Sequence, residues 1–313
     1  MTVRSTRDWF GDALVELADD HDDVMVVNCD LASATRTSRF AERHPDRFVE
    51  CGIAEANAIG IAAGLAQEGY RPFVASFAHF ITGKYLEIFQ SIGLNGAGVV
   101  VVGTHAGLAI GQDGPTQMGL RDLALMRTLP NVEILQPADG HETRQMLEHL
   151  VSHHRPSYLR LCRQPLREVH AGDDRFVPGR PAVLHRGTDV AVFTMGGMLP
   201  VVLDAVDELA RVGIHPSVVN ASSLPVARAA VEEIARAHGS VFVVEDHADV
   251  GGLGDEIARI VAGMPDDVRF EAWGVADYAQ AGTPGELYAR YQLDTAGVTR
   301  RLTTFLRDRG GRS

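Results

Sequence analysis

The chain contains little cysteine, no excess of basic charge and no long apolar run. Its 3 cysteines in 313 residues, Cys29, Cys51 and Cys162, lack the spacing of a metal site, so buried free thiols are expected. Lys and Arg total 29 against 41 Asp and Glu, a formal net charge of −12, which repels nucleic acid and anionic lipid surfaces. No apolar run reaches membrane-spanning length, and residues 1–20 lack the apolar core and cleavage site of a signal peptide. These absences argue against nucleic-acid and membrane partners and predict a cytoplasmic protein.

The residues that are present indicate a globular α/β protein. The chain is 45% hydrophobic and 22% charged, which is typical of folded domains. Short β-branched runs alternate with stretches whose apolar residues recur every three or four positions, as in parallel-sheet folds. The alternation stops at a Pro-, Gly- and Asp-rich stretch and then resumes. We therefore predict two consecutive α/β domains, residues 1–170 and 182–313, joined by a linker at 171–181.

One carboxylate stands out at the start of a predicted helix over residues 55–68. Glu55 occurs in "CGIAEANAIGIAAGL", among small and apolar residues. An acid in the first turn of a helix commonly complements the helix dipole. A carboxyl group kept from water, however, resists ionisation and can become a hydrogen-bond partner for a ring nitrogen. Residue type alone leaves both interpretations open.

The segment around Glu55 resembles the cofactor-activating segment of thiamine-diphosphate enzymes of the transketolase group. Further segments resemble that group in the same order, from residue 5 to about residue 260: "STRDWFGDALVELADD", "NCDLASATRT", "FVASFAHF", "GTHAGLAIGQDGPTQMGLRDLALMRTLPNVEILQPAD", "RLCRQPL" and "VVEDHADVGGLGDEIA". The match covers only the second and third domains of such enzymes. It implies a thiamine-diphosphate pyrimidine-binding fold followed by a transketolase C-terminal-like domain.

The resemblance assigns cofactor-binding residues. Glu55 is implied to hydrogen-bond the aminopyrimidine of thiamine diphosphate and so to promote loss of the thiazolium proton. Phe77 and Phe80 are implied to wall the pyrimidine, although ordinary core packing is the alternative. Asp30 and Ile53 complete the implied cofactor-binding set.

The resemblance also assigns substrate-binding residues, in a glycine-rich loop after a predicted strand and beyond it. His105 is implied to bind a sugar-phosphate end, and Asp113 a hydroxyl of the donor. Arg163 and Arg7 are implied phosphate ligands, since a guanidinium suits phosphate. A surface arginine is the alternative for each of them.

Three departures from the family pattern affect specificity. Gln117 stands where histidine usually follows "DGPT", and glutamine cannot carry charge or a proton. Ala34, rather than Ser33, occupies the position of the usual phosphate-site serine. Gly83 replaces a third aromatic residue. These changes predict a modified donor or acceptor, such as a sugar acid, a deoxy sugar or a pathway-specific ketose.

The resemblance also shows what the chain does not contain. The "GDG" and downstream asparagine that hold magnesium in these enzymes are missing, and no other cluster of hard oxygen ligands replaces them. We therefore expect a separate N-terminal-type subunit to carry the diphosphate and magnesium, in an α2β2 heterotetramer. The apolar helix after Glu55 would lie at that interface.

The resulting hypothesis is the C-terminal-type, or beta, subunit of a split transketolase, a transferase that moves a two-carbon ketol unit from a ketose to an aldose. A deoxyxylulose-phosphate-synthase-like acyloin condensation and a 2-oxo-acid dehydrogenase beta subunit are enzymatic alternatives. A non-catalytic regulatory or scaffold subunit is the alternative of another class. The acids and His247 in "VVEDHADVGGLG" are interpreted as loop and helix-capping residues rather than metal ligands, while the glycines could cradle an anion.

Overall fold

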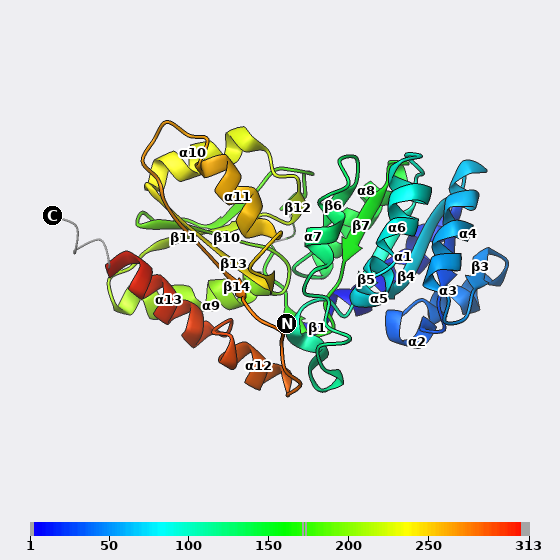
Figure 1. Cartoon of the computed structure of the whole chain (residues 1–313), viewed down its shortest axis with the longest axis horizontal. Coiled ribbons are helices and arrows are strands. Elements are labelled where there is room, and N and C mark those ends of the chain that lie inside the picture. Colours follow the sequence, from blue (N-terminus) through cyan, green and yellow to red (C-terminus); the bar gives the residue numbers. More distant parts are fainter. Residues whose placement is uncertain (1–2, 171, 173, 308–313) are drawn as a thin grey trace.

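The computed structural model describes residues 3–170, 172 and 174–307. It shows two α/β units side by side, each built around its own sheet (Figure 1), which confirms the predicted fold class. Residues 171 and 173 of the predicted linker lie outside the described residues, as do residues 1–2 and 308–313 at the ends of the two predicted domains.

The first sheet has 7 strands in the order β12-β6-β7-β5-β4-β2-β3. Their bounds are β2 (Val24–Asn28), β3 (Phe48–Glu50), β4 (Arg71–Phe77), β5 (Val100–Thr104), β6 (Glu133–Leu135), β7 (Ser157–Arg160) and β12 (Ser223–Leu224). All neighbours pair in parallel except β12, which is antiparallel to β6. Because β12 comes from the second half of the chain, the two units share this edge of the sheet.

Helices cover both faces of the first sheet. One face carries α1 (Thr6–Asp20), α3 (Ser38–Arg43) and α8 (Gly140–Ser152); the other carries α4 (Glu55–Gln67), α5 (Ala78–Thr82), α6 (Tyr85–Glu87), the π-helix η2 (Ile88–Gly93) and α7 (Asp122–Met126). In β5, Val100 and Val102 pack on the α1 and α8 side, whereas Val101 packs on the α4 side. Burial on both faces requires such uninterrupted apolar strands. Short elements α2 (Ala32–Thr35), η1 (Pro45–Arg47) and η3 (Leu108–Asp113) lie in the connections.

The second sheet has 5 strands in the order β14-β13-β10-β11-β9. They are β9 (Ala182–His185), β10 (Val190–Thr194), β11 (Pro216–Asn220), β13 (Ser240–Ala248) and β14 (Arg269–Val275), with α10 (Arg228–His238) and α11 (Leu253–Val261) on one face and α9 (Met198–Arg211), α12 (Pro284–Arg290) and α13 (Thr295–Arg307) on the other. Only β9 is antiparallel to its neighbour. A separate antiparallel pair, β1 (Val3–Arg4) and β8 (Leu166–Arg167), ties the N-terminal segment to the strand β7 region.

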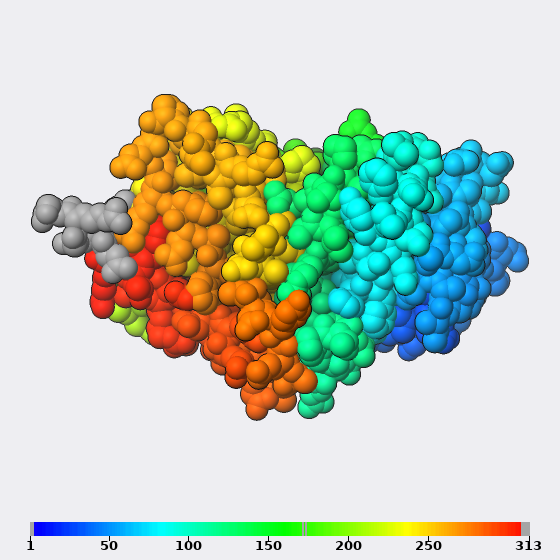
Figure 2. Space-filling view, viewed as in Figure 1, coloured from blue at the N-terminus to red at the C-terminus, as the bar shows by residue number. Residues whose placement is uncertain are grey.

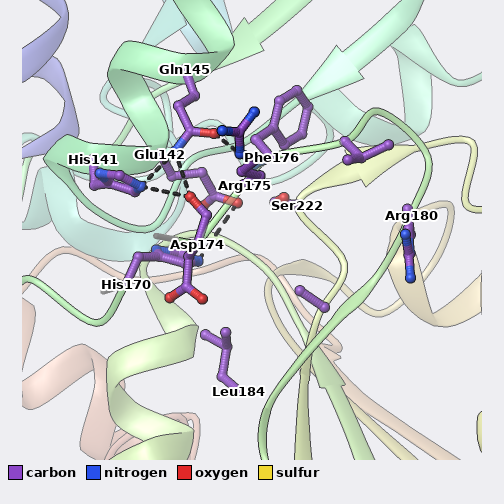
Figure 3. Close-up of a pocket in the computed structure, with 12 residues that line it drawn as sticks. His141, Glu142, Gln145, His170, Asp174, Arg175, Phe176, Arg180, Leu184 and Ser222 are labelled. Carbon is purple, nitrogen blue, oxygen red and sulfur yellow. Dashed lines mark hydrogen bonds and ion pairs between the residues drawn. The ribbon is translucent and has the colours of Figure 1, made fainter. Parts of the chain in front are cut away.

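A small cavity of about 60 Å³ lies where the linker crosses α8 (Figure 3). Beside it, His170 Nδ1 lies 2.9 Å from Asp139 Oδ2, and Asn220 Nδ2 of the second unit donates to Glu142 Oε1 at 2.9 Å. Burial by itself would raise the pKa of Asp139, but the hydrogen bond from His170 and its charge lower it to about 2. Conversely, burial disfavours the charged imidazole, yet Asp139 and Glu142 hold the pKa of His170 above its usual value. This buried charge pair fixes the chain where it leaves the first unit.

Candidate cofactor and substrate site

Glu55 is the first residue of α4 and points toward the sheet. It is 8% exposed, and the hydroxyl of Ser76, near the end of β4, donates to its Oε1 at 3.0 Å. An acid that only complements a helix dipole has no need of burial or of a partner on another element. The position therefore suits a carboxylate that presents its second oxygen to a ligand.

The two predicted wall residues, at the end of β4 and in α5, lie together. The rings of Phe77 and Phe80 are stacked with centroids 5.4 Å apart. Phe77 is buried within the core, as the packing alternative expects, while Phe80 is half-buried and His79 between them is exposed. Gly83 ends α5 and adds no side chain, so the predicted wall would consist of two aromatic rings.

Asp30 and Ile53 lie on the surface. Ile53 is 84% exposed, and Asp30 adopts a left-handed backbone with φ 57°. The Glu50 carboxylate fixes the backbone at Asp30 and next to Ile53, because it accepts the backbone N–H of Asp30 at 2.7 Å and of Gly52 at 2.9 Å. Both predicted cofactor residues are therefore accessible from the surface of the chain.

His105 follows β5 and is held in one tautomer. Thr104 Oγ1 donates to the carbonyl of Ser76 at 3.2 Å and therefore accepts from His105 Nδ1, 2.9 Å away. Arg7 Nη1 lies 2.9 Å from His105 Nε2, and a guanidinium can only donate, so Nε2 carries no proton. Burial and then the charges of Arg7, Arg163 and Arg36 lower the pKa of His105 to about 3. The imidazole is neutral and orients Arg7.

A group of positive charges surrounds this histidine. The Arg7 side chain is 11% exposed, and it donates to the carbonyl of Ala34 at 3.0 Å. Its Nε is buried and has no hydrogen-bond partner among the described residues. Burial, opposed by Asp8 but reinforced by Arg36 and Arg163, lowers the pKa of Arg7. Such a concentration of guanidinium groups suits an anion.

The glycine-rich loop brings Asp113 close to Arg163. Arg163 Nη1 lies 3.8 Å from Asp113 Oδ2 and donates to the carbonyl of Ile110 at 3.3 Å. The side chains of Asp113 and Arg163 are about half exposed, at 48% and 46%. Gln117 is half-buried, and its backbone N–H donates to Gly114 at 3.1 Å. The carbonyl of Ala34 faces Arg7, whereas Ser33 is exposed.

Sequence reasoning did not find two residues that support the site, Ser76 and Thr104. Each is a hydroxyl residue near the end of a fully buried strand. Because buried hydroxyl groups require hydrogen-bond partners, a hydroxyl residue in a buried strand indicates a polar contact. The sequence does not indicate which residue is the partner.

Glu245, Asp246 and His247 lie at the end of β13 rather than in the predicted loop, while Glu245 has the predicted helix-capping role. Glu245 accepts the backbone N–H groups of Leu253 and Gly254 at 2.8 Å each, so it caps α11. Burial raises the pKa of this carboxyl to about 7. The group bound by the backbone of "GGLG" is thus a carboxyl group of the chain itself.

Comparison with known proteins is consistent with this geometry. The family model described as the transketolase pyrimidine-binding domain matches residues 3–169, and the transketolase C-terminal domain matches residues 179–298. An apulose-4-phosphate transketolase subunit of Phocaeicola vulgatus is 33% identical over 96% of this chain and 97% of its own length. A 6-deoxy-6-sulfo-D-fructose transketolase subunit of a Clostridium strain is 32% identical over 94% of this chain and 92% of its own length.

Other relatives are about twice as long. The 1-deoxy-D-xylulose-5-phosphate synthase 1 of Geobacter sulfurreducens is 33% identical over 96% of this chain, which spans 48% of that protein. Among solved structures, a split gene transketolase described as an inactive beta4 tetramer superposes with a TM-score of 0.89 and 37% identity, covering 97% of this chain and 98% of the other.

The match of one domain model to the first unit and of the other to the second defines a transketolase-type protein. The chain belongs to the transketolase family and corresponds to the C-terminal subunit of its split members. The predicted family and its transketolase-like, transferase-type role are thereby confirmed. In the part of the chain that the structure describes, no helix is long and apolar enough to cross a membrane.

Proposed function

We propose that this chain is the beta-type subunit of a thiamine-diphosphate-dependent enzyme that transfers a two-carbon ketol unit from a ketose to an aldose. The observation that carries the proposal is the placement of Glu55, buried at the start of α4 against Ser76 and beside the stacked pair Phe77 and Phe80. These residues fit the pyrimidine half of the cofactor, with Ile53 and Asp30 at its edge. When bound, thiamine diphosphate supplies the electron sink that allows a carbon–carbon bond next to a carbonyl to break.

The chain's own residues bind and orient both molecules. Glu55 holds the pyrimidine ring by a hydrogen bond, and Ser76 keeps that carboxyl group in place. Arg7 and Arg163 bind the anionic end of the sugar, with His105 orienting Arg7 through its unprotonated Nε2 rather than donating a proton itself. Asp113 accepts a hydrogen bond from a donor hydroxyl.

Gln117 supports the proposal that the substrate is an unusual sugar. It offers an amide at neutral charge where a histidine could carry a proton, and it lies on the same loop as Asp113. We therefore infer a phosphorylated or otherwise anionic sugar with a modified carbon skeleton. The relatives named for apulose-4-phosphate and for a sulfonated deoxyfructose support this direction.

The open face of α4 is the proposed docking surface for the partner subunit. Ala56, Gly60 and Gly64 are exposed one turn apart, and nothing lies within 4 Å of a Cβ built at either glycine. Small residues allow another helix to approach closely. The partner would carry the diphosphate and magnesium and close the cofactor site, in an α2β2 assembly. The family's split subunits support this arrangement.

Reconstitution tests the proposal. The chain and its co-purified diphosphate-domain subunit are mixed with thiamine diphosphate and magnesium, and deuterium exchange of the thiazolium proton is followed together with ketol transfer. Glu55→Ala should slow exchange by orders of magnitude with the fold intact, and Ser76→Ala by about tenfold, the effect of one lost hydrogen bond. Ser152→Ala, on the exposed end of α8, is the control. Unchanged exchange in Glu55→Ala would return Glu55 to the role of a helix-dipole acid.

The relatives of about twice this length support a second candidate function, an acyloin condensation like that of 1-deoxy-D-xylulose-5-phosphate synthase. The same reconstituted enzyme separates the two functions. Carbon dioxide release from a 2-oxo acid would support condensation, whereas aldose release from a ketose without carbon dioxide would support ketol transfer.

A further inference from the structure

The glycine-rich loop between β5 and α7 closes on itself at its base. Gly107 donates its N–H to the carbonyl of Gly119 at 2.9 Å, and Ala106 forms a bridge with Gly119. Between these ends, η3 carries Asp113, and the turn that follows carries Gln117. Nothing in this local pairing sets where the tip of the loop points.

The end of β13, in the second unit, binds both ends of this loop. Leu108 donates its N–H to Asp246 Oδ1 at 2.9 Å, and Ala248 donates its N–H to the carbonyl of Leu120 at 2.8 Å. The two contacts lie on one strand end, so the loop has the second unit as a fixed support.

Buried Arg160, at the end of β7, links the same segments. Its Nη2 donates to the carbonyl of Gly119 at 2.8 Å and to that of Asp246 at 3.0 Å. Its Nε donates to Asp122 Oδ2 at 2.7 Å. The loop base, the start of α7 and the end of β13 therefore share one guanidinium.

Asp246 itself is buried, and both of its carboxyl oxygens accept a hydrogen bond. Its second carboxylate oxygen, Oδ2, accepts from the hydroxyl of Tyr288 on α12. A Cβ built at Gly107, which has φ 77°, would overlap that same oxygen, so the loop can approach only without a side chain there. Figure 2 shows the orange surface of the α12 region against the green surface of the loop. On the same side, Gly111 packs against Gly282 and Pro284.

We propose that Asp246, supported by Tyr288, is a positioning residue that sets the place of the substrate loop, so that the second domain contributes to discrimination between ketose donors. Asp246 does not touch the substrate; it acts through Leu108 on the segment that ends at Asp113. The inference rests on the proposed function for its catalytic consequence, although the fixation of the loop can be measured without it.

The first test uses the chain alone. Amide hydrogen exchange of residues 107–113 should be about tenfold faster in Asp246→Ala, the effect of one lost hydrogen bond, and faster to a smaller degree in Tyr288→Phe. Amides of α4 should be unchanged. Asp294→Ala is the matched control, since Asp294 also accepts a backbone N–H, from Gly297 at 2.8 Å, but does so in another part of the second unit. Wild-type exchange of the loop in a folded Tyr288→Phe or Asp246→Ala chain would overturn the proposal.

The second test uses the reconstituted complex. Tyr288→Phe and Asp246→Ala should raise the KM of the ketose donor several-fold to tenfold while thiazolium proton exchange keeps its wild-type rate, because Glu55 lies on α4. Equal losses in both measurements would mean a general structural role and would overturn the positioning role. An inactive wild-type complex with an altered loop in the variants would reject the proposed function while retaining the fixation of the loop by Asp246.

Discussion

Arg7 Nη1 lies 2.9 Å from His105 Nε2, so a residue in the first turn of α1 sets the protonation state of a histidine 98 positions along the chain. Because the guanidinium can only donate, that nitrogen carries no proton, and the other nitrogen, Nδ1, donates its N–H to Thr104 Oγ1. The histidine of the candidate substrate site therefore acts as a neutral acceptor that directs a positive charge.

Removing that charge should change the titration of His105. In Arg7→Met the pKa of His105 should rise from about 3 but stay below its ordinary value, because burial remains the largest cause of the shift. NMR titration of the ring nitrogens in the isolated chain measures this change. Arg43→Met, which removes an exposed arginine paired with Asp19, is the control. An identical titration in Arg7→Met would show that the two side chains do not meet in solution.

The open face of α4 gives a prediction about assembly. Gly60→Leu should leave the chain folded, since no atom lies within 4 Å of the new Cβ and leucine favours helix over glycine. It should weaken binding of the diphosphate-domain subunit tenfold or more, because the added side chain overpacks a close interface. Titration calorimetry measures the Kd. Gly285→Leu, the same change at an exposed glycine of α12, should bind normally; equal affinity for both variants would place the interface elsewhere.

The buried charge pair at the linker predicts a pH-dependent stability. Since the pKa of His170 is raised in the fold, its contribution is complete below the unfolded value near 6.5 and is lost as the pH rises through the folded value. Asp139, with a pKa of about 2, stays ionised throughout. The Tm advantage of the wild type over His170→Gln should therefore be larger at pH 6 than at pH 9. His185→Gln on β9 is the control, and a constant difference across this range would contradict the assignment.

Substitution of the buried Arg160 should cause a large loss of stability. Arg160 and Asp122 have side chains 2% and 0% exposed, and burial of Asp122 is outweighed by Arg160, which lowers the pKa of that carboxyl. Arg160→Met leaves this charge unpaired and should cost about 3–5 kcal/mol in the free energy of unfolding. Urea unfolding measures it. Arg167→Met breaks the exposed pair with Asp204 and should cost less than about 1 kcal/mol; similar costs for the two would be inconsistent with the buried pair.

The family, the two α/β units and the segments that carry the site could be predicted from sequence. Helix α1 over residues 6–20 and the strands β2, β4 and β5 follow from periodicity, because apolar spacing reports which faces of an element are buried. The short strand β12 was not predicted, since two residues carry no period and pair only because the second half of the chain passes the edge of the first sheet.

By itself, the sequence determined which chemistry the chain can present: Glu55, the Phe77 and Phe80 pair, and the arginines, each recognisable from its motif because these short segments carry their own pattern. Only the tertiary structure decided how they act together. The Arg7 and His105 pair, the Ser76 bond to Glu55 and the contact of Asp246 with the substrate loop join residues 21 to 138 positions apart. Such contacts depend on the direction of each side chain after the sheets and helices have packed, and spacing along the chain carries no record of that direction.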